Sequence, residues 1–309
     1  MAAHLTPGDA VPAGVPGQPG QAAPAGPAAQ PGQAAPAGTG GGPVRLDGVR
    51  AVVTGATSGL GRAMADALLA HGARVAMAAR PTPRLAEAAE ERRRRGLHAL
   101  ALPMDVRLDD DVRAAAGRLL DDWGGVDLVV NNAGIGMRVV NPRFFSDPRP
   151  FFEVSPDDFR DAVATNLTGY FLVARAFAPG MVARGTGRFV NVSMNHDTMR
   201  RRGFVPYGPS RAGAEALSLI MAEDLRPFGV AVNLLLPGGA TDTGMIPAEL
   251  PEEARARLLA PEIMGPPVVF LASPEAEGLT GERIVASEWD RWLADHRAAG
   301  GGATVPASP

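Results

Sequence analysis

The sequence runs Val52-Val53-Thr54-Gly55-Ala56-Thr57-Ser58-Gly59-Leu60-Gly61-Arg62 at the point that decides its fold. A short apolar run breaks into a glycine-spaced loop, and a helical pattern over about residues 60–71 follows at once. Glycines let the backbone of the loop turn tightly and come close to a ligand. The helix directs unpaired N–H groups and its positive dipole end at the loop, and this arrangement binds a pyrophosphate. The stretch therefore predicts a strand, a phosphate-binding loop and a helix.

The chain around this stretch repeats the same alternation of short apolar runs and helical patterns. Because the runs are apolar throughout, they predict a parallel sheet that is covered by helices on both faces. Such a sheet binds its ligands at the carboxyl ends of the strands, where the strand order reverses. Strands are expected at 51–54, 74–79, 98–102, 127–131, 188–192, 230–236 and 283–285, and helices at 60–71, 84–95, 109–123, from Ser155-Pro156 onward, 207–226, 247–260 and 267–272.

One α/β domain is expected at 44–297, between tails at 1–43 and 298–309. The first tail consists of Pro, Ala, Gly and Gln, and the octet Pro-Gly-Gln-Ala-Ala-Pro-Ala-Gly occurs in it twice, at 19–26 and 31–38. With so little apolar bulk it cannot offset the entropy of ordering, and we expect it to be disordered. A passive tail is favoured over a partner-binding one.

Composition and charge exclude several classes of function. The formal net charge of −3 provides no excess of positive charge to attract nucleic acid or an anionic membrane. The absence of Cys excludes disulfides and thiol chemistry. His196 and Asp197 lack a third ligand in sequence, so no metal site is expected. No apolar run has the length that a bilayer requires, and the N-terminus lacks the layout of a signal peptide. These features predict a cytoplasmic protein.

The end of the second expected strand indicates which dinucleotide is bound. An acidic residue there accepts a hydrogen bond from a ribose 2′-hydroxyl, whereas an arginine binds a 2′-phosphate. Between Asp66 and Glu87 the sequence has no Asp or Glu, and the strand runs into Arg80 with Arg84 one turn on. Guanidinium groups bind phosphate bidentately. NADP(H) is therefore favoured over NAD(H), the alternative being that Arg80 only begins a solvated loop.

Residues 54–61 have the pattern TGxxxGxG, Asn131-Asn132-Ala133-Gly134 ends the fourth expected strand, and Asn166 lies in an expected helix. With two later motifs, they resemble in order and spacing the TGxxxGxG, NNAG and helix-asparagine motifs of the short-chain dehydrogenase/reductase family, from about residue 46 to 293. Tyr207-Gly208-Pro209-Ser210-Arg211 stands where the family carries YxxxK, and Pro237-Gly238 begins its PG…T segment. The resemblance implies a three-layer Rossmann fold, a doubly wound parallel sheet of about seven strands flanked by helices.

The resemblance also implies a role for each residue of these motifs. Tyr207 is the expected general acid and base, assisted by Arg211, with Asn166 completing the catalytic group. Asp105 and Val106 belong to the turn that contacts the adenine. The residues expected to bind the cofactor are Gly55, Thr57, Ser58, Gly59, Leu60, Gly61, Arg80, Asp105, Val106, Asn132, Ala133, Gly134, Tyr207, Arg211, Pro237, Gly238, Thr241 and Thr243.

Two positions depart from the family's pattern. The lysine that assists the tyrosine is replaced by Arg211, whose permanent charge keeps the electrostatic role while its fork alters the ribose geometry and proton relay. All 30 basic residues are Arg, so a compositional bias can account for this change. The Ser or Thr expected thirteen residues before Tyr207 is Met194, flanked by Ser193 and Asn195. Ser193 is the favoured substrate donor, with Asn195 or no donor as alternatives.

These observations predict an NADP(H)-dependent oxidoreductase that interconverts a secondary alcohol and a ketone. The alternative is a dinucleotide-binding, catalytically impaired relative that serves as a binding or partner subunit. The partners expected are a small carbonyl or alcohol substrate and, by resemblance, further copies of the chain in a dimer or tetramer. Arg200–Arg202 lie near the expected pocket, and surface or subunit-contact charge is favoured there over the attraction of an anionic substrate. The insertion at 142–154 is expected to be a loop, and apolar residues in and near it form either a pocket or core: Met137, Phe144, Phe145, Phe151 and Phe152.

Overall fold

The computed structural model describes residues 44–247 and 249–300 and contains a seven-stranded parallel sheet. The order β3-β2-β1-β4-β5-β6-β7 reverses direction between β1 and β4, so this is the doubly wound three-layer fold that the sequence predicts. Val52 of β1 lies opposite Ala76 of β2 and Val129 of β4. The strands are β1 Arg50–Thr54, β2 Arg74–Ala79, β3 Ala99–Pro103, β4 Leu128–Asn131, β5 Gly187–Val192, β6 Val230–Leu236 and β7 Arg283–Val285.

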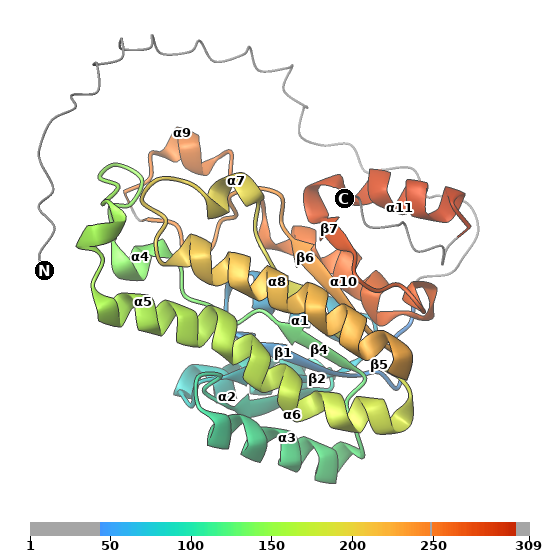
Figure 1. The fold of residues 1–309 in the computed structure, drawn as a ribbon. Helices are drawn as coiled ribbons and strands as arrows, with labels where there is room; N and C mark the ends of the chain where they lie inside the picture. Colours follow the sequence, from blue (N-terminus) through green and yellow to red (C-terminus); the bar gives the residue numbers. More distant parts are fainter. Residues whose placement is uncertain (1–43, 248, 301–309) are drawn as a thin grey trace, which may run out of the picture. The chain divides into compact units, whose positions relative to one another are not determined.

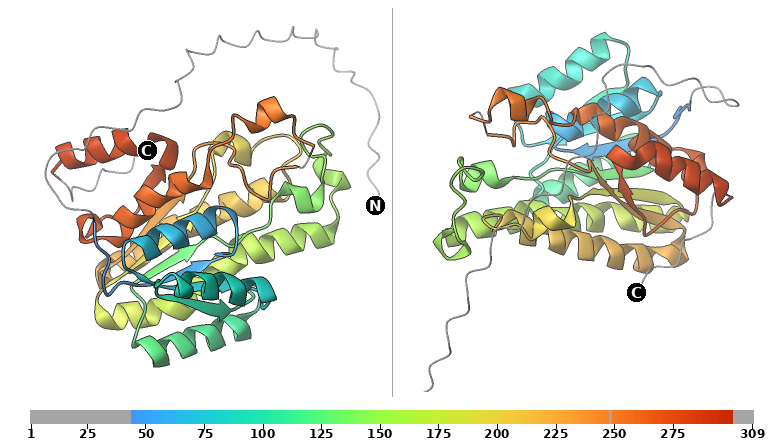
Figure 2. Two further views of the ribbon diagram at one scale, coloured as in Figure 1. Left: turned by 180° about the vertical axis from the view of Figure 1, so that it is seen from behind. Right: turned by 90° about the horizontal axis from the view of Figure 1, so that it is seen from above.

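Helices cover both faces of the sheet, as Figures 1 and 2 show from opposite sides. Helices α1, α2 and α10 pack on one face, and α3, α6 and α8 on the other. Their bounds, with those of the remaining helices, are α1 Gly59–Ala70, α2 Pro83–Arg94, α3 Asp109–Trp123, α4 Met137–Val140, α5 Pro156–Val163, α6 Gly169–Arg184, α7 His196–Met199, α8 Tyr207–Leu225, α9 Glu252–Arg255, α10 Gly265–Ala272 and α11 Trp289–Ala298.

The two cores follow from the alternation of side chains along each strand. Val53 of β1 joins the core beneath α1 and α10, whereas its neighbour Val52 joins the core beneath α3, α6 and α8. The same division separates Val190 from Phe189 on β5. Because successive strand residues point to opposite faces, a strand between two helical layers must be apolar at every position. This is why the strands could be found in the sequence as uninterrupted apolar runs.

The expected elements differ from the structure mainly on the carboxyl side of the sheet. The helix expected at 247–260 was wrong in extent: only α9 is α-helical, because Pro251 and Pro261 bracket a short segment otherwise made of turns. Two further four-residue helices, α4 and α7, follow β4 and β5 and had not been expected. Ser155 caps α5 as expected, since its hydroxyl accepts from Asp158 N.

The structure describes only part of the two expected tails. The tail expected at 1–43, and residues 301–309 of the second tail, lie outside the described residues. The second tail was expected from 298, but α11 continues to Ala298. Among the helices of the described ranges, none is long and apolar enough to span a bilayer.

Candidate active site

A cleft of about 820 Å³ lies at the carboxyl ends of the strands, where the strand order reverses. Every residue expected to bind the cofactor lines this cleft, with the exception of Gly61. A Cβ on Gly61 would lie 2.4 Å from the carbonyl oxygen of Gly55, so this glycine lets α1 pack closely beneath the loop. Such a switch point is where open α/β sheets bind their ligands.

The glycine loop is held in a conformation that leaves an anion site open. Gly55 and Gly59 adopt φ values of 67° and 52°, which side chains other than glycine rarely tolerate. Ser58 caps α1 without a side-chain hydrogen bond, and the first turn of α1 contains no acidic residue. The N–H groups and positive dipole end of this 12-residue helix therefore face the cleft without a counter-charge from the helix itself. This cradle fits a dinucleotide pyrophosphate.

The Asn131–Gly134 motif, at the end of β4, is hydrogen-bonded directly to β1. The Thr54 hydroxyl accepts from the backbone N–H groups of Asn132 and Ala133, both at 2.9 Å. The Asn132 amide in turn donates to the Thr54 carbonyl at 2.8 Å. These reciprocal bonds bring the glycine loop and the Asn131–Gly134 motif into one rigid wall of the cleft.

Arginines surround the end of the cleft at β2 and β3. Arg80 lines it as expected, whereas Arg84 does not. Arg107 binds both carboxylate oxygens of Asp105, at 3.0 Å from Nε to Oδ1 and 2.7 Å from Nη2 to Oδ2. Hydrogen bonds from Arg107 are the main reason that the pKa of Asp105 lies below its ordinary value, with a further contribution from the charge of Arg80. Because Arg107 is paired with Asp105, Arg80 is the cation that remains available for a phosphate group at this end of the cleft.

Both tyrosines of the chain, Tyr170 and Tyr207, face the side chain of Arg211. Arg211 Nη1 donates to the Tyr170 hydroxyl at 2.6 Å and to the Val192 carbonyl at 3.1 Å, and the Tyr170 hydroxyl also donates to Val192 O. Arg211 Cζ lies 5.4 Å from the centroid of the Tyr207 ring. The spacing of Tyr207 and Arg211 by one helical turn of α8 puts both on the side of the cleft.

Arg211 is a fully buried cation, and among the described residues no carboxylate lies within 4 Å of it. Its Nε is buried without a hydrogen-bond partner. Burial lowers the pKa of Arg211, but the facing oxygens of Tyr170 and Tyr207 raise it by more, so the guanidinium stays charged. Burial raises the pKa of Tyr170, against the opposing charge of Arg211, so this phenol stays protonated. The cleft is thus built around a positive charge beside Tyr207.

Asn166 lies beneath the cleft rather than in its wall. It sits in the π-helical turn Ala164–Thr168 between α5 and α6, where its amide donates to Ile135 O at 3.0 Å and to Ser210 Oγ at 2.9 Å. Its Oδ1 accepts from Ile135 N at 2.9 Å. A π-turn of this kind often marks a functional site. Asn166 therefore joins the end of β4 to α8, and its side chain positions the site without facing a substrate.

The hydroxyl of Ser193 faces Glu215 of α8, so the expected substrate donor is committed to another partner. The alternation of β5 explains this orientation, because Asn191, two residues earlier, also points to α8 and donates to Ser218 Oγ at 2.7 Å. Met194, at the sequence position where the family's pattern has Ser or Thr, packs in one cluster with Tyr207. The alternative donor Asn195 gives a hydrogen bond to Gly238 O at 2.8 Å.

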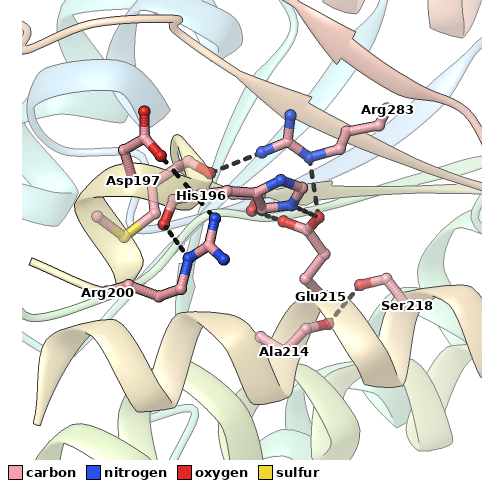
Figure 3. A network of polar contacts seen from close by, with 9 residues as sticks. His196, Asp197, Arg200, Ala214, Glu215, Ser218 and Arg283 are labelled. Atoms are coloured by element: carbon pink, nitrogen blue, oxygen red, sulfur yellow. Dashed lines mark hydrogen bonds and ion pairs between the residues drawn. The ribbon is translucent and has the colours of Figure 1, made fainter.

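Glu215 accepts hydrogen bonds from three side chains around the segment that follows β5. Figure 3 shows two of them, His196 and Arg283. The Glu215 carboxylate accepts from Ser193 Oγ, from His196 Nε2 at 2.7 Å and from Arg283 Nε at 2.8 Å. Arg283 Nη2 also donates to Met194 O at 2.9 Å. Burial raises the pKa of Glu215, but these hydrogen bonds and the charge of Arg283 outweigh it, so the pKa lies below its ordinary value.

Replacing Glu215 with glutamine is expected to lower the free energy of unfolding by about 2 kcal/mol, because a mostly buried ion pair loses one charge. Since the pKa is depressed in the folded state, the wild type should lose this contribution as the pH falls through that lowered pKa, and the variant should not. Glu223→Gln, on the exposed side of the same helix, is the matched control and should cost clearly less stability, because solvent screens its ion pair with Arg226. Urea denaturation at several pH values measures both; equal costs for the two variants would contradict the role of Glu215.

The remaining wall of the cleft, beside Tyr207, is largely apolar. Of the aromatic residues whose role was left open, Phe144 and Phe145 line it together with Met137. Phe151 and Phe152 do not line it and are 71 % and 74 % exposed. No cluster of His, Asp and Glu able to hold a metal ion occurs within the described ranges.

Several contributors to the site were missed in the sequence. Glu215 follows Tyr207 and Arg211 at the same four-residue interval, so helical spacing alone places it on their face of α8. Tyr170 follows Asn166 by one turn, which was also available as a signal. No sequence pattern indicated the contacts of Arg107 and Arg283. The contact of Arg107 with Asp105 depends on the direction of a side chain, and the partners of Arg283 lie in other segments of the chain.

Comparisons with known proteins agree with this geometry. The model of the short chain dehydrogenase family matches residues 50–254. A 3-oxoacyl-acyl-carrier-protein reductase of Vibrio harveyi is 32 % identical over 250 residues, which cover 78 % of this chain and 96 % of that protein. The structure of a gluconate 5-dehydrogenase from Burkholderia cenocepacia, in complex with NADP and tartrate, superposes with a TM-score of 0.70 at 28 % identity, covering 78 % of this chain and 94 % of that one. A metagenomic short-chain oxidoreductase in complex with NADP gives a TM-score of 0.65 at 30 % identity, covering 78 % and 97 %.

The chain belongs to the short-chain dehydrogenase family. It is accordingly an oxidoreductase that acts on alcohol or carbonyl groups.

Proposed function

We propose that this protein uses NADP(H) to interconvert a secondary alcohol and a ketone, with Tyr207 as the general acid and base. The observation that carries the proposal is the buried Arg211 guanidinium beside Tyr207, in a cleft that also contains an open anion cradle at the start of α1. The complexes of two relatives with NADP support the choice of cofactor.

The glycine loop would hold the pyrophosphate of the cofactor, and Arg80 its 2′-phosphate. Asp105 and Val106 would lie against the adenine, Asn132–Gly134 and Arg211 near the ribose, and the nicotinamide against Pro237, Gly238, Thr241 and Thr243. The cofactor supplies or accepts the hydride.

In the direction of reduction, the Tyr207 hydroxyl gives its proton to the substrate oxygen as the C–H bond forms at the carbonyl carbon. In oxidation, Tyr207 takes the proton back. An isolated phenol titrates at about pH 10, so the reaction at neutral pH depends on a nearby positive charge. Arg211 would supply that charge by stabilising the negative charge that develops on the Tyr207 oxygen. Because Ser193 and Asn195 have other partners, we assign the proton transfer to Tyr207 without a second donor.

Titration of the purified protein with NADPH and NADH, followed by fluorescence, tests this proposal together with a panel of ketones. Tight binding of NADPH and reduction of a ketone would support it. Tight binding without turnover of any ketone or alcohol would instead favour the catalytically impaired alternative. Failure to bind either dinucleotide would contradict both.

Replacing Arg80 with aspartate is expected to shift the ratio of NADPH to NADH affinity towards NADH by about 100-fold, because a bidentate phosphate contact becomes a like-charge repulsion. Arg84→Asp is the matched control, since Arg84 lies four residues on and does not line the cleft. The two dissociation constants of each variant measure the effect. An unchanged ratio in Arg80→Asp would remove Arg80 from the 2′-phosphate site.

We also propose that the protein forms a dimer or tetramer, as the family resemblance implies. Large apolar side chains are exposed on neighbouring helices: Phe159 of α5, Phe171 of α6, and Leu219 and Ile220 of α8. Contact between copies of the chain would remove this apolar surface from water.

A further inference from the structure

The part of the cleft beside Tyr207 has almost no hydrogen-bonding side chains to offer a substrate. The apolar side chains that line the cleft on this side include Met137, Val139, Phe144, Phe145, Met194 and Phe204. Five residues of this region form one buried cluster against which Tyr207 packs: Met137, Phe144, Met194, Met199 and Phe204. A wall of thioethers and phenyl rings stabilises an apolar ligand and leaves the hydroxyl groups of a polar one unpaired.

Most polar side chains near this wall are already engaged, and Thr198 is the neutral one that lines the cleft with its hydroxyl available to a ligand. Ser193 donates to Glu215, and Asn195 donates to Gly238 O. At the far side of the cleft, Thr165 donates to Asp161 O. A polyhydroxylated substrate would therefore lose hydrogen bonds to water on entering, at a cost of about 1–3 kcal/mol for each group that finds no partner.

Arg201 is the exception to this apolar character. It lines the cleft, and its Cζ lies 5.6 Å from the ring centroid of Phe145 and 5.4 Å from that of Phe204. The two rings of the apolar wall thus hold the guanidinium at its edge through cation–π contacts. Arg201 has no acidic partner within 4 Å among the described residues, whereas its neighbour Arg200 lies 3.9 Å from Asp197. A guanidinium held in this way is matched to a carboxylate of a ligand.

We infer that the substrate is a keto acid or hydroxy acid with an apolar body. Its hydrocarbon or aryl part packs on the Met and Phe side chains of the wall, and its carboxylate pairs with Arg201. This inference rests on the proposed function for the carbonyl reaction at Tyr207, and adds the class of molecule that is reduced or oxidised there. The arginine run at 200–202 is thereby divided: Arg201 belongs to the site, and Arg202 does not line the cleft.

Four ketones separate the contributions that the apolar part and the carboxylate of the substrate make to kcat/KM. These are 4-oxo-4-phenylbutanoate, its methyl ester, 4-oxopentanoate and 5-keto-D-gluconate. The first has both features, the second lacks the charge, the third lacks the aryl body, and the fourth has a polyhydroxylated body. We expect kcat/KM with NADPH to be highest for the first, by about tenfold or more over each of the others, which corresponds to about 1.4 kcal/mol.

Arg201→Gln tests the carboxylate contact. It is expected to raise KM for 4-oxo-4-phenylbutanoate by about tenfold, with kcat unchanged, and to leave the methyl ester unaffected, because only ground-state binding of the charge is lost. Arg202→Gln, one residue away, is the matched control and should alter neither. A preference for 5-keto-D-gluconate, or an equal effect of Arg201→Gln on acid and ester, would overturn the inference.

Calorimetric binding of the same four compounds, to the protein alone and with NADP⁺, separates this inference from the proposed reaction. If no ketone is reduced but 4-oxo-4-phenylbutanoate binds more tightly than its ester, and Arg201→Gln removes the difference, the proposed reaction fails and the ligand class stands. If ketones are reduced but neither body nor charge affects binding, the reaction stands and the ligand class fails.

Discussion

Replacing Tyr207 with phenylalanine is expected to lower kcat for ketone reduction by about 10³-fold, because the substitution removes the only proton donor assigned to the substrate oxygen. The affinity for NADPH should stay within about threefold, since the ring and its packing against the Met–Phe cluster are kept. Consumption of NADPH with a ketone substrate measures the first quantity, and fluorescence titration the second.

Tyr170→Phe is the matched comparison, because it removes the same hydroxyl from the only other tyrosine of the chain. Tyr170 positions Arg211 and is itself buried beneath the cleft. Its loss is expected to lower kcat by about tenfold, through a less ordered guanidinium. A Tyr207→Phe enzyme that keeps a turnover within tenfold of the wild type would contradict the assignment of the acid, whatever the result for Tyr170.

The parts of the site that could be predicted are those whose signal is local. The glycine loop, the Asn131–Gly134 motif and Arg80 each follow an apolar strand directly, so the strand end places them at one edge of the sheet. The fold was predictable for the same reason, because strands buried on both faces are apolar at every position. The strand order and the family match confirm the predicted fold.

The parts that escaped prediction depend on the direction of a side chain or on a distant partner. Ser193 has suitable chemistry one residue from the expected position, but the alternation along β5 turns its hydroxyl to Glu215. Tyr170 and Arg211 are 41 residues apart, and the spacing of Tyr170 one turn after Asn166 does not indicate that its hydroxyl contacts Arg211. Arg201 was interpreted as surface or subunit-contact charge, because the aromatic rings beside it come partly from the insertion after α4.

The structure also changes the interpretation of Arg211. From the sequence alone, arginine in place of lysine was a departure that compositional bias could explain. The contacts of Arg211 instead form a specific set: Nη1 is bound by Tyr170 and Val192, and a Cβ on Gly134 would lie 2.2 Å from Nη2. The absence of a side chain at Gly134 thus leaves room for the second arm of the guanidinium. These specific contacts of the guanidinium favour a functional role for Arg211 over a change due to compositional bias alone.

Replacing Arg211 with methionine should therefore separate stability from activity. A buried cation without a carboxylate partner and with an unpaired Nε costs free energy in the folded state. Its removal by a side chain of similar length is expected to leave the free energy of unfolding unchanged or to raise it by up to about 2 kcal/mol. The same change should lower kcat/KM by about 100-fold, because the charge that stabilises the Tyr207 oxygen is lost. Arg211→Lys keeps the charge and should recover most of this loss.

Arg92→Met provides the opposite pattern and serves as the control. Arg92 is equally buried, but it binds both carboxylate oxygens of Asp66, at 2.6 and 2.8 Å, and does not line the cleft. Its replacement is expected to cost about 1–2 kcal/mol of stability, because Asp66 loses its partner, and to leave kcat/KM unchanged. Denaturation measures the free energy of unfolding of both variants, and steady-state kinetics measures their kcat/KM. If Arg211→Met also lost stability and its activity fell only with the folded fraction, Arg211 would be a structural residue like Arg92.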